Sequence, residues 1–251
     1  MAQQTAGNID DVLEEILDYQ VDGIVLASVA MSSMLAERCD AAGIPVVLFN
    51  RAQQEDRFST VTSDNFAGGK ALAEFLVAGG HRRIGYIAGW EGASTQRDRE
   101  AGFCAGLAEH GHKLFARGVG DFRTETAANA ARAMFSASEF PDAVFVANDH
   151  MAFAVIEELR GTLGLRVPED VSVVGYDDVQ LSRWSSFDLT TVRQPSGEMV
   201  AETVAALMAQ IEDGETEPRR VKIDGPLVVR GSARRPADWK ANWKECDDER
   251  L

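Results

Sequence analysis

Residues 141–178 read PDAVFVANDHMAFAVIEELRGTLGLRVPEDVSVVGYDD and hold the clearest sign of the fold. Two short apolar runs, 143–147 and 171–176, are typical of strands covered on both faces of a sheet. The stretch between them, 150–163, has the amphipathic pattern of a helix. Because a strand, a helix and a second strand follow one another with short connections, this segment predicts two parallel strands joined by a crossover helix.

The same alternation extends along the chain on both sides of this segment. Further strands are expected at 22–27, 45–49 and 83–88. Amphipathic helices are expected at 9–19, 31–42, 66–78, 96–109, 124–137 and 197–212. Several of these helices are followed by glycine, the usual residue at a helix C-terminus. The sequence therefore predicts a doubly wound α/β fold with parallel sheets.

The composition excludes several classes of protein. The 251 residues include 25 Lys and Arg against 40 Asp and Glu, a net charge of −15, and 45% are hydrophobic. Such a chain is globular, and its acidic surface is unsuited to broad contact with nucleic-acid phosphates. Cys39, Cys104 and Cys246 are too few and too scattered for a disulfide framework, which indicates reduced thiols. With neither a signal sequence nor an apolar run of roughly 18 residues, we expect a cytoplasmic protein that does not enter a membrane.

The familiar catalytic and metal-binding motifs are not found. His110 and His112 have no third ligand at a zinc-binding spacing, so no metal is expected. Gly68-Gly69-Lys70 resembles part of a phosphate-binding loop, but Asp64 stands at the position of its first glycine. We interpret these glycines as small residues that let a helix pack closely. Asp149 is interpreted as an ordinary charge in the first turn of a helix, and neither an enzyme nor a cofactor is expected.

Polar residues follow the predicted strands, at the edge where parallel α/β sheets bind ligands. Asn50, Asn148 and Asp177 each come after an apolar strand, and Asp64 follows the short run 60–63. Amide and carboxylate groups offer planar, two-point hydrogen bonding, which suits a ligand rich in hydroxyl groups. The simpler alternative is that such residues only form turns and helix N-caps.

Two further residues favour a binding pocket over that simpler alternative. Arg99 lies near the start of the helix after the strand at 83–88, where its guanidinium could fork two oxygens. Phe122 lies in the loop GDFRTE and could supply a flat apolar face for a sugar ring. We expect replacement of Arg99 by Ala to weaken ligand binding by about 1.5–3 kcal/mol and to leave the fold little affected.

Four segments of the chain together resemble the LacI/GalR family of transcription regulators. They are VTSDNFAGGKALAEFLVAGGHRRIGYIAG (61–89), RDREAGFCAGL (97–107), VFVANDHMAFAVIEEL (144–159) and VPEDVSVVGYDDVQLSRWSSFDLTTVRQP (167–195). The likeness is collinear and covers about residues 8–235. It implies two α/β lobes joined by three crossovers, as in type I periplasmic sugar-binding proteins, with the ligand between the lobes. The implied lobes are 1–64 plus 194–223, and 66–192 plus 225–231, followed by a polar tail at 232–251.

The resemblance also implies which residues contact the ligand. By position they are Asn50, Asp64, Thr95, Arg99, Phe122, Asn148, Asp177 and Gln194. Arg99 would fork two ligand oxygens, Asn148 and Asp177 would bond hydroxyl groups, and Phe122 would pack on the ring. Asp64 lies at a crossover, where a ligand contact is less favoured.

The resemblance implies the sensing half of a regulator. The family's N-terminal helix-turn-helix, its hinge helix and its first strand–helix–strand unit have no counterpart in this sequence. We therefore expect an incomplete first lobe and no operator binding by this chain itself. The implied partners are a sugar or sugar-acid effector, a second copy in a homodimer, and operator DNA through a helix-turn-helix. The alternatives are a solute-binding protein of a sugar transporter, which needs a signal peptide, and a sugar-acting α/β enzyme.

Overall fold

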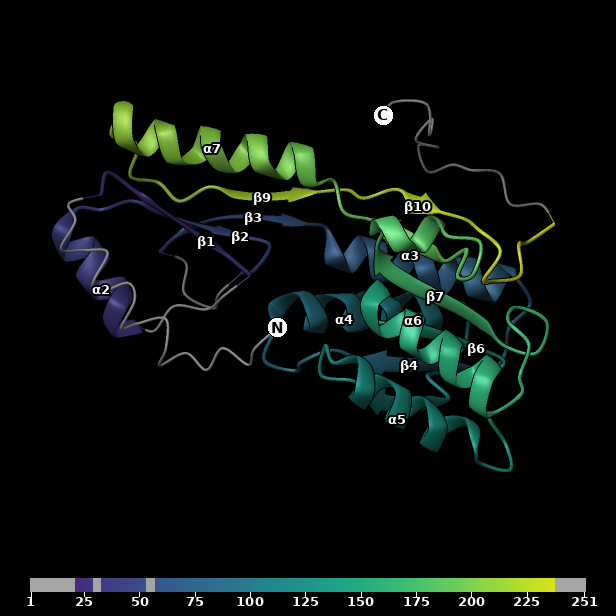
Figure 1. Cartoon of the computed structure of the whole chain (residues 1–251). Coiled ribbons are helices and arrows are strands. Elements are labelled where there is room, and N and C mark those ends of the chain that lie inside the picture. The colour runs from purple at the N-terminus through teal and green to yellow at the C-terminus, as the bar shows by residue number, and fades with distance from the viewer. Residues whose placement is uncertain (1–20, 29–32, 53–56, 238–251) are drawn as a thin grey trace. The chain divides into compact units, whose positions relative to one another are not determined.

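The computed structural model describes residues 21–28, 33–52 and 57–237 (Figure 1). The helix predicted at 9–19 and residues 238–251 of the predicted polar tail lie outside these ranges. The chain forms two compact units, residues 1–63 with 195–223 and residues 64–194 with 224–251. It therefore passes from one unit to the other at three places, after Ser63, after Gln194 and after Ile223.

The first unit contains a four-stranded parallel sheet in the order β1-β2-β3-β9. Its elements are β1 (Ile24–Ala27), α2 (Ser33–Ala42), β2 (Val46–Phe49), β3 (Ser59–Ser63), α7 (Ser196–Glu212) and β9 (Arg220–Ile223). Among the described strands, β1 lies at an edge of this sheet.

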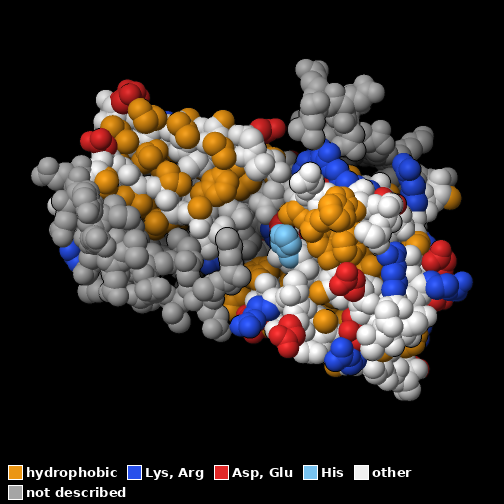
Figure 2. All heavy atoms as spheres, viewed as in Figure 1, with side chains coloured by type: hydrophobic (Ala, Val, Ile, Leu, Met, Phe, Trp, Pro, Cys, Tyr) orange, Lys and Arg blue, Asp and Glu red, His pale blue; other side chains and the backbone are white. Residues whose placement is uncertain are grey.

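Both faces of this sheet are covered, because α2 packs on one face and α7 on the other. Leu26 and Leu48 belong to the apolar cluster on the α2 side, and Val47 and Val61 contact α7. The outer side of α7 has a row of exposed apolar side chains, and Figure 2 shows apolar atoms gathered over this helix. The row consists of Val200, Val204, Met208 and Ile211.

The second unit contains a six-stranded sheet in the order β10-β8-β7-β6-β4-β5. Its strands are β4 (Ile84–Ala88), β5 (Ala116–Val119), β6 (Ala143–Val146), β7 (Ser172–Asp177), β8 (Thr190–Arg193) and β10 (Leu227–Val228). Its helices are α3 (Asn65–Ala78), α4 (Ser94–Glu109), α5 (Thr124–Phe135) and α6 (Asp149–Glu157), with short helices η1 (Glu158–Thr162) and η2 (Gln180–Arg183). All neighbours in the sheet are parallel except β10, which pairs antiparallel with β8.

The direction of the chain reverses within the sheet of the second unit. From β4 the chain moves outward to β5, and it then returns past β4 to β6 and β7. Because such crossovers are right-handed, α4 lies on one face and α5 and α6 lie on the other (Figure 1). The carboxyl ends of β4 and β6 therefore flank a topological switch point, where open α/β sheets bind ligands.

The predicted parallel α/β class is confirmed, whereas four strands were missed. β5 and β9 have alternating, partly exposed residues because both lie at sheet edges, and β10 has only two residues. β8 reads TTVR and looks polar, yet it is largely buried because its threonine hydroxyls are hydrogen-bonded. The helix predicted at 150–163 is α6 followed by one turn of π-helix. No helix in the described part of the chain combines the length and apolarity needed to cross a membrane.

Candidate ligand-binding site

The close crossing of α3 and α4 brings the first residues of α3 beside the first turns of α4. A Cβ on Gly69 would overlap the carbonyl oxygen of Arg99, and one on Gly102 would overlap that of Phe66. The two helix backbones are therefore in contact at both glycines. This confirms the interpretation of the glycine pair at 68–69 as a close-packing feature.

The guanidinium of Arg99 lies at this crossing and is held by three elements of the second unit. Its Nε donates to Asn65 Oδ1 on α3 at 2.8 Å, and its Nη1 donates to the Ala147 carbonyl after β6 at 2.6 Å. Its Nη2 donates to Asp177 Oδ1 at the end of β7, at 3.2 Å. Arg99 is only 3% exposed. The sequence predicts an arginine that matters little to the fold, whereas in the structure Arg99 is part of the core, because its head group joins α3, β6 and β7.

The aromatic ring of Tyr176 forms the floor beneath this guanidinium. The centre of the Arg99 guanidinium lies 3.7 Å from the ring centroid, a cation–π contact. Gly68 makes room for Tyr176, because a Cβ there would lie 2.6 Å from the tyrosine hydroxyl. The Tyr176 ring and the three hydrogen bonds together fix the orientation of the Arg99 guanidinium.

Asp177 links Arg99 to Gln194. The Asp177 Oδ1 atom accepts from Arg99 Nη2 and from Gln194 Nε2, and the Gln194 backbone N–H donates to the Asp177 carbonyl at 3.2 Å. The Asp177 backbone has φ of 128°, an unusual value for a residue with a side chain. Burial raises the pKa of its carboxyl, whereas the positive charge of Arg99 acts in the opposite direction.

Thr95 and Phe122 lie near the end of β4. Thr95 is buried in the first turn of α4. The next residue, Gln96, accepts hydrogen bonds from the Tyr86 hydroxyl at 2.9 Å and from the Gly89 N–H at 2.7 Å, which ties α4 to this strand end. The Phe122 ring packs against Gly89, where a Cβ would overlap the ring.

Asp64 and Asn148 cap helices. Asp64 Oδ1 accepts from the Ala67 N–H at 2.9 Å at the start of α3. Asn148 Oδ1 accepts from the Met151 N–H at 3.0 Å at the start of α6. The simpler interpretation, that strand-end polar residues are helix N-caps, is therefore correct for the Oδ1 atoms of Asp64 and Asn148. Each cap also fixes a helix that carries other residues of the site.

The interpretation of Asp149 as an ordinary helix charge is wrong. Its carboxylate is completely buried and accepts hydrogen bonds from the Thr191 and Ser182 hydroxyls, both at 2.7 Å, and from the Val179 N–H at 3.0 Å. Burial, and secondly the negative charge of Asp177, raise its pKa to about 6. Asp149 thus joins the start of α6 to η2 and β8, close enough to Asp177 for the two charges to interact.

Asn50 belongs to the first unit. It follows β2 with φ of 57°, and its Nδ2 donates to Ser28 Oγ at 3.3 Å. The structure therefore brings the other predicted residues together at the strand ends of the second unit and describes Asn50 separately.

Three residues of this cluster, Asn65, Tyr176 and Asp149, are not among the predicted ligand contacts, although Asn65 and Asp149 also follow predicted strands. Asn65 lies beside Asp64 at a strand end, which was a usable signal. Tyr176 belongs to an apolar strand and gave no signal. For Asp149, no local pattern distinguishes a buried carboxylate from a solvated one.

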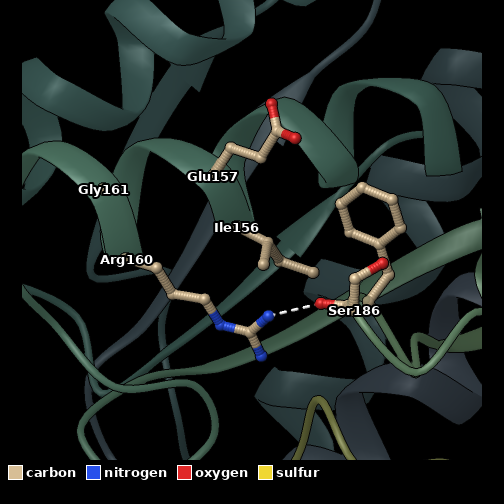
Figure 3. Close-up of a pocket in the computed structure, with 6 residues that line it drawn as sticks. Ile156, Glu157, Arg160, Gly161 and Ser186 are labelled. Carbon is tan, nitrogen blue, oxygen red and sulfur yellow. Dashed lines mark hydrogen bonds between the residues drawn. The ribbon is translucent and has the colours of Figure 1, made fainter.

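A separate pocket of about 380 Å³ lies at the other end of α6 (Figure 3). It is lined by Ile156, Glu157, Arg160, Gly161, Ser186 and Phe187. Arg160 Nη1 donates to the Ser186 carbonyl across this pocket. None of the predicted ligand residues lines it. Among the described residues, no group of three His, Cys, Asp or Glu side chains is placed to bind a metal.

The fold of this chain is that of the periplasmic binding protein-like class. The family model described as periplasmic binding protein-like domain matches residues 73–233. The transcriptional regulator CelR of Thermobifida fusca is 37% identical over 219 residues, which is 84% of this chain and 63% of that protein. The PurR repressor of Photobacterium profundum is 30% identical over 236 residues, 92% of this chain and 70% of that protein.

A solved structure described as a CelR–cellobiose complex matches with a TM-score of 0.83 and 34% identity, over 90% of this chain and 71% of that one. This chain belongs to the LacI/GalR family of transcription regulators, through its periplasmic binding protein-like domain. It spans 63% to 70% of the length of the two curated relatives named here.

Proposed function

We propose that this chain is the effector-sensing core of a LacI/GalR-type regulator and that it binds a small sugar-like molecule. The observation that carries the proposal is the Arg99–Asp177 pair, fixed at the topological switch point of the second unit. A guanidinium has five N–H groups, and three of those on Arg99 hold it in place. The other two serve two ligand oxygens.

The surrounding groups suit a neutral or singly acidic sugar. Arg99 and Asp177 compensate each other's charge, so a neutral ligand leaves no buried charge unpaired. Asp177 accepts from a ligand hydroxyl, and the side-chain amides of Asn148 and Gln194 and the Thr95 hydroxyl add donors and acceptors. Phe122 supplies an apolar face for a ring. The cellobiose complex of the CelR relative supports a sugar as the first ligand to test.

The proposal extends to how binding is used. The two compact units correspond to the two lobes that the family resemblance implies, and ligand occupancy shifts a conformational equilibrium of the chain. That equilibrium changes the affinity for operator DNA through a helix-turn-helix, the motif in the names of both relatives. The regulator acts as a homodimer in the cytoplasm. The chain acts by binding and not by catalysis.

A binding screen tests the proposal. The chain is titrated with cellobiose, monosaccharides, sugar acids and nucleobases, with the melting temperature and then calorimetry as readouts. We expect at least one sugar or sugar acid to bind, and Asp177→Asn to weaken its binding by about 10- to 100-fold, the loss expected for a hydrogen bond to a charged group. Asp170→Asn is the matched control, because Asp170 pairs with Arg166 on an exposed surface. Stabilisation by nucleobases alone would show that the ligand class is wrong, and turnover of a sugar would show that the chain is an enzyme.

A further inference from the structure

Two of the three crossings between the units lie next to residues that are hydrogen-bonded to the Arg99–Asp177 pair. Asn65 is the second residue after the crossing at Ser63, and Gln194 is the last residue before the next crossing. Asn65 accepts from Arg99, and Gln194 donates to Asp177. Asn65 and Gln194 are 129 positions apart in the sequence (194 − 65). In the structure they are linked through only the Arg99 guanidinium and the Asp177 carboxylate.

The third crossing is joined to the same place through the backbone. The Arg193 N–H donates to the Pro226 carbonyl at 2.9 Å, three residues beyond the crossing at Ile223. Gly225 lies directly against the Arg193 carbonyl, where a Cβ would overlap the oxygen. Arg193, the neighbour of Gln194 in the chain, is thus in backbone contact with the segment that follows the third crossing.

We propose that Asn65 and Gln194 are positioning residues, and that the chain of contacts Asn65–Arg99–Asp177–Gln194 transmits ligand occupancy to the crossings between the units. What occupies the Arg99–Asp177 pair rests on the proposed function, but the mechanical link between the crossings does not. The four side chains are called the relay below.

The geometry of Asp177 makes the relay responsive to a ligand. One oxygen, Oδ1, accepts from both Arg99 and Gln194, so the two hydrogen bonds depend on each other. The bond from Arg99 Nη2 is long at 3.2 Å, whereas its bonds to Asn65 and Ala147 are shorter, at 2.8 and 2.6 Å. A ligand oxygen that draws on Arg99 or Asp177 thus acts first on the Arg99–Asp177 bond. The change then reaches Gln194 through Oδ1.

Hydrogen exchange of single backbone amides, followed by NMR on the free chain, tests the relay without a ligand. The reporters are the N–H groups of Arg193 and Gln194, which donate to Pro226 and to Asp177. In Asn65→Ala we expect these two amides to exchange about three- to tenfold faster, the factor equivalent to one net hydrogen bond. Amides of β6 should keep their wild-type rates, since a general loss of stability would accelerate all of them.

Two further variants separate transmission from simple damage. Asn65→Asp keeps an oxygen that accepts from Arg99 Nε and should restore slow exchange at both reporters. Asn129→Ala removes an exposed asparagine whose Oδ1 accepts from Arg132 at 3.2 Å, and it should leave the reporters unchanged. Unchanged exchange at Arg193 and Gln194 in Asn65→Ala, or the same acceleration in Asn129→Ala, would overturn the relay.

Cellobiose, or another sugar from the binding screen, provides the second measurement. In the wild type we expect the sugar to slow exchange at both reporters, and in Asn65→Ala the slowing should be at least halved at saturating sugar. Equal slowing in both proteins would overturn transmission through Asn65. If no sugar binds the wild type, the proposed ligand class fails, and the comparison of the free proteins still decides the relay.

Discussion

The guanidinium of Arg99 on α4 stacks on the ring of Tyr176 on β7 at 3.7 Å, and α4 touches α3 through glycines. The stacking requires Gly68, the hydrogen bond to Asn65 requires the crossing at Gly69, and the third partner lies on β7. A residue that sequence analysis places at the rim of a pocket is therefore also part of the core of the second unit.

Replacement of Arg99 by Ala should lower the free energy of unfolding by about 3 kcal/mol, because it leaves the Asp177 carboxylate, whose side chain is only 19% exposed, without its cation. This replaces the expectation from sequence that the fold is little affected. Urea unfolding followed by circular dichroism measures the change. Arg166→Ala is the control, since its guanidinium is exposed and paired with Asp170, and it should change stability by about 1 kcal/mol or less. A wild-type midpoint for the Arg99 variant would contradict the prediction.

Replacement of Gly69 by Ala should force α3 and α4 apart, because the new Cβ overlaps the Arg99 carbonyl. We expect a loss of about 1–3 kcal/mol in stability and weaker ligand binding, since Arg99 moves relative to Asp177. Gly161→Ala is the matched control, because no atom lies within 4 Å of its added Cβ. The control should change stability by about 1 kcal/mol or less, in the stabilising direction. Equal thermal melting temperatures for the two variants would count against the close crossing.

Asp149 should make folding less favourable as the pH rises. Its pKa is about 6 in the folded chain against an ordinary value of 3.8, chiefly because it is buried and secondly because Asp177 is near. The folded chain therefore binds the proton more tightly, and this contribution to stability is lost as the pH rises through about 6. In Asp149→Asn that loss disappears, so the variant should gain about 2 kcal/mol relative to the wild type between about pH 4.5 and 7.5. Urea midpoints across this range are the measurement.

Asp170→Asn is the control for this titration. Arg166 lowers the pKa of Asp170 to about 2, so this carboxyl stays ionised over the whole range. The stability of each variant relative to the wild type is compared across the pH range. If Asp170→Asn gains as much stability with rising pH as Asp149→Asn does, Asp149 is not the source of the pH dependence.

His81 should make folding more favourable as the pH rises, the opposite of the effect of Asp149. Burial, and secondly Arg234, lower its pKa from 6.5 to about 4, so the folded chain holds it neutral. Its contribution to stability is present above about pH 6.5 and is lost as the pH falls towards 4. His81→Gln should therefore lose about 2–3 kcal/mol less than the wild type on acidification from about pH 7.5 to 4.5. The exposed His110→Gln is the control in the same urea series, and no change of slope in His81→Gln would refute the assignment.

The sequence alone determined the class of fold and the sheet edge at which the candidate site lies. Short apolar runs such as 143–147 predict buried parallel strands because each face of the strand needs apolar cover. Polar residues directly after those runs, such as Asn148 and Asp177, must lie at the carboxyl ends of the strands, whatever the details of packing. β8 was missed because its threonines make it look polar. The Thr190 and Thr191 hydroxyls are hydrogen-bonded to distant segments, so the strand is buried although its sequence is not apolar.

Only the tertiary structure decided what each polar residue does. Asp149 and Asp177 are both strand-end carboxylates in sequence, yet one is enclosed by Ser182 and Thr191 and the other faces Arg99. Asn65 became a partner of Arg99 because α3 and α4 cross at glycines, a contact between positions 34 residues apart. Hydrogen bonding and burial depend on distances that the folded chain creates, and local sequence patterns contain no information on those distances.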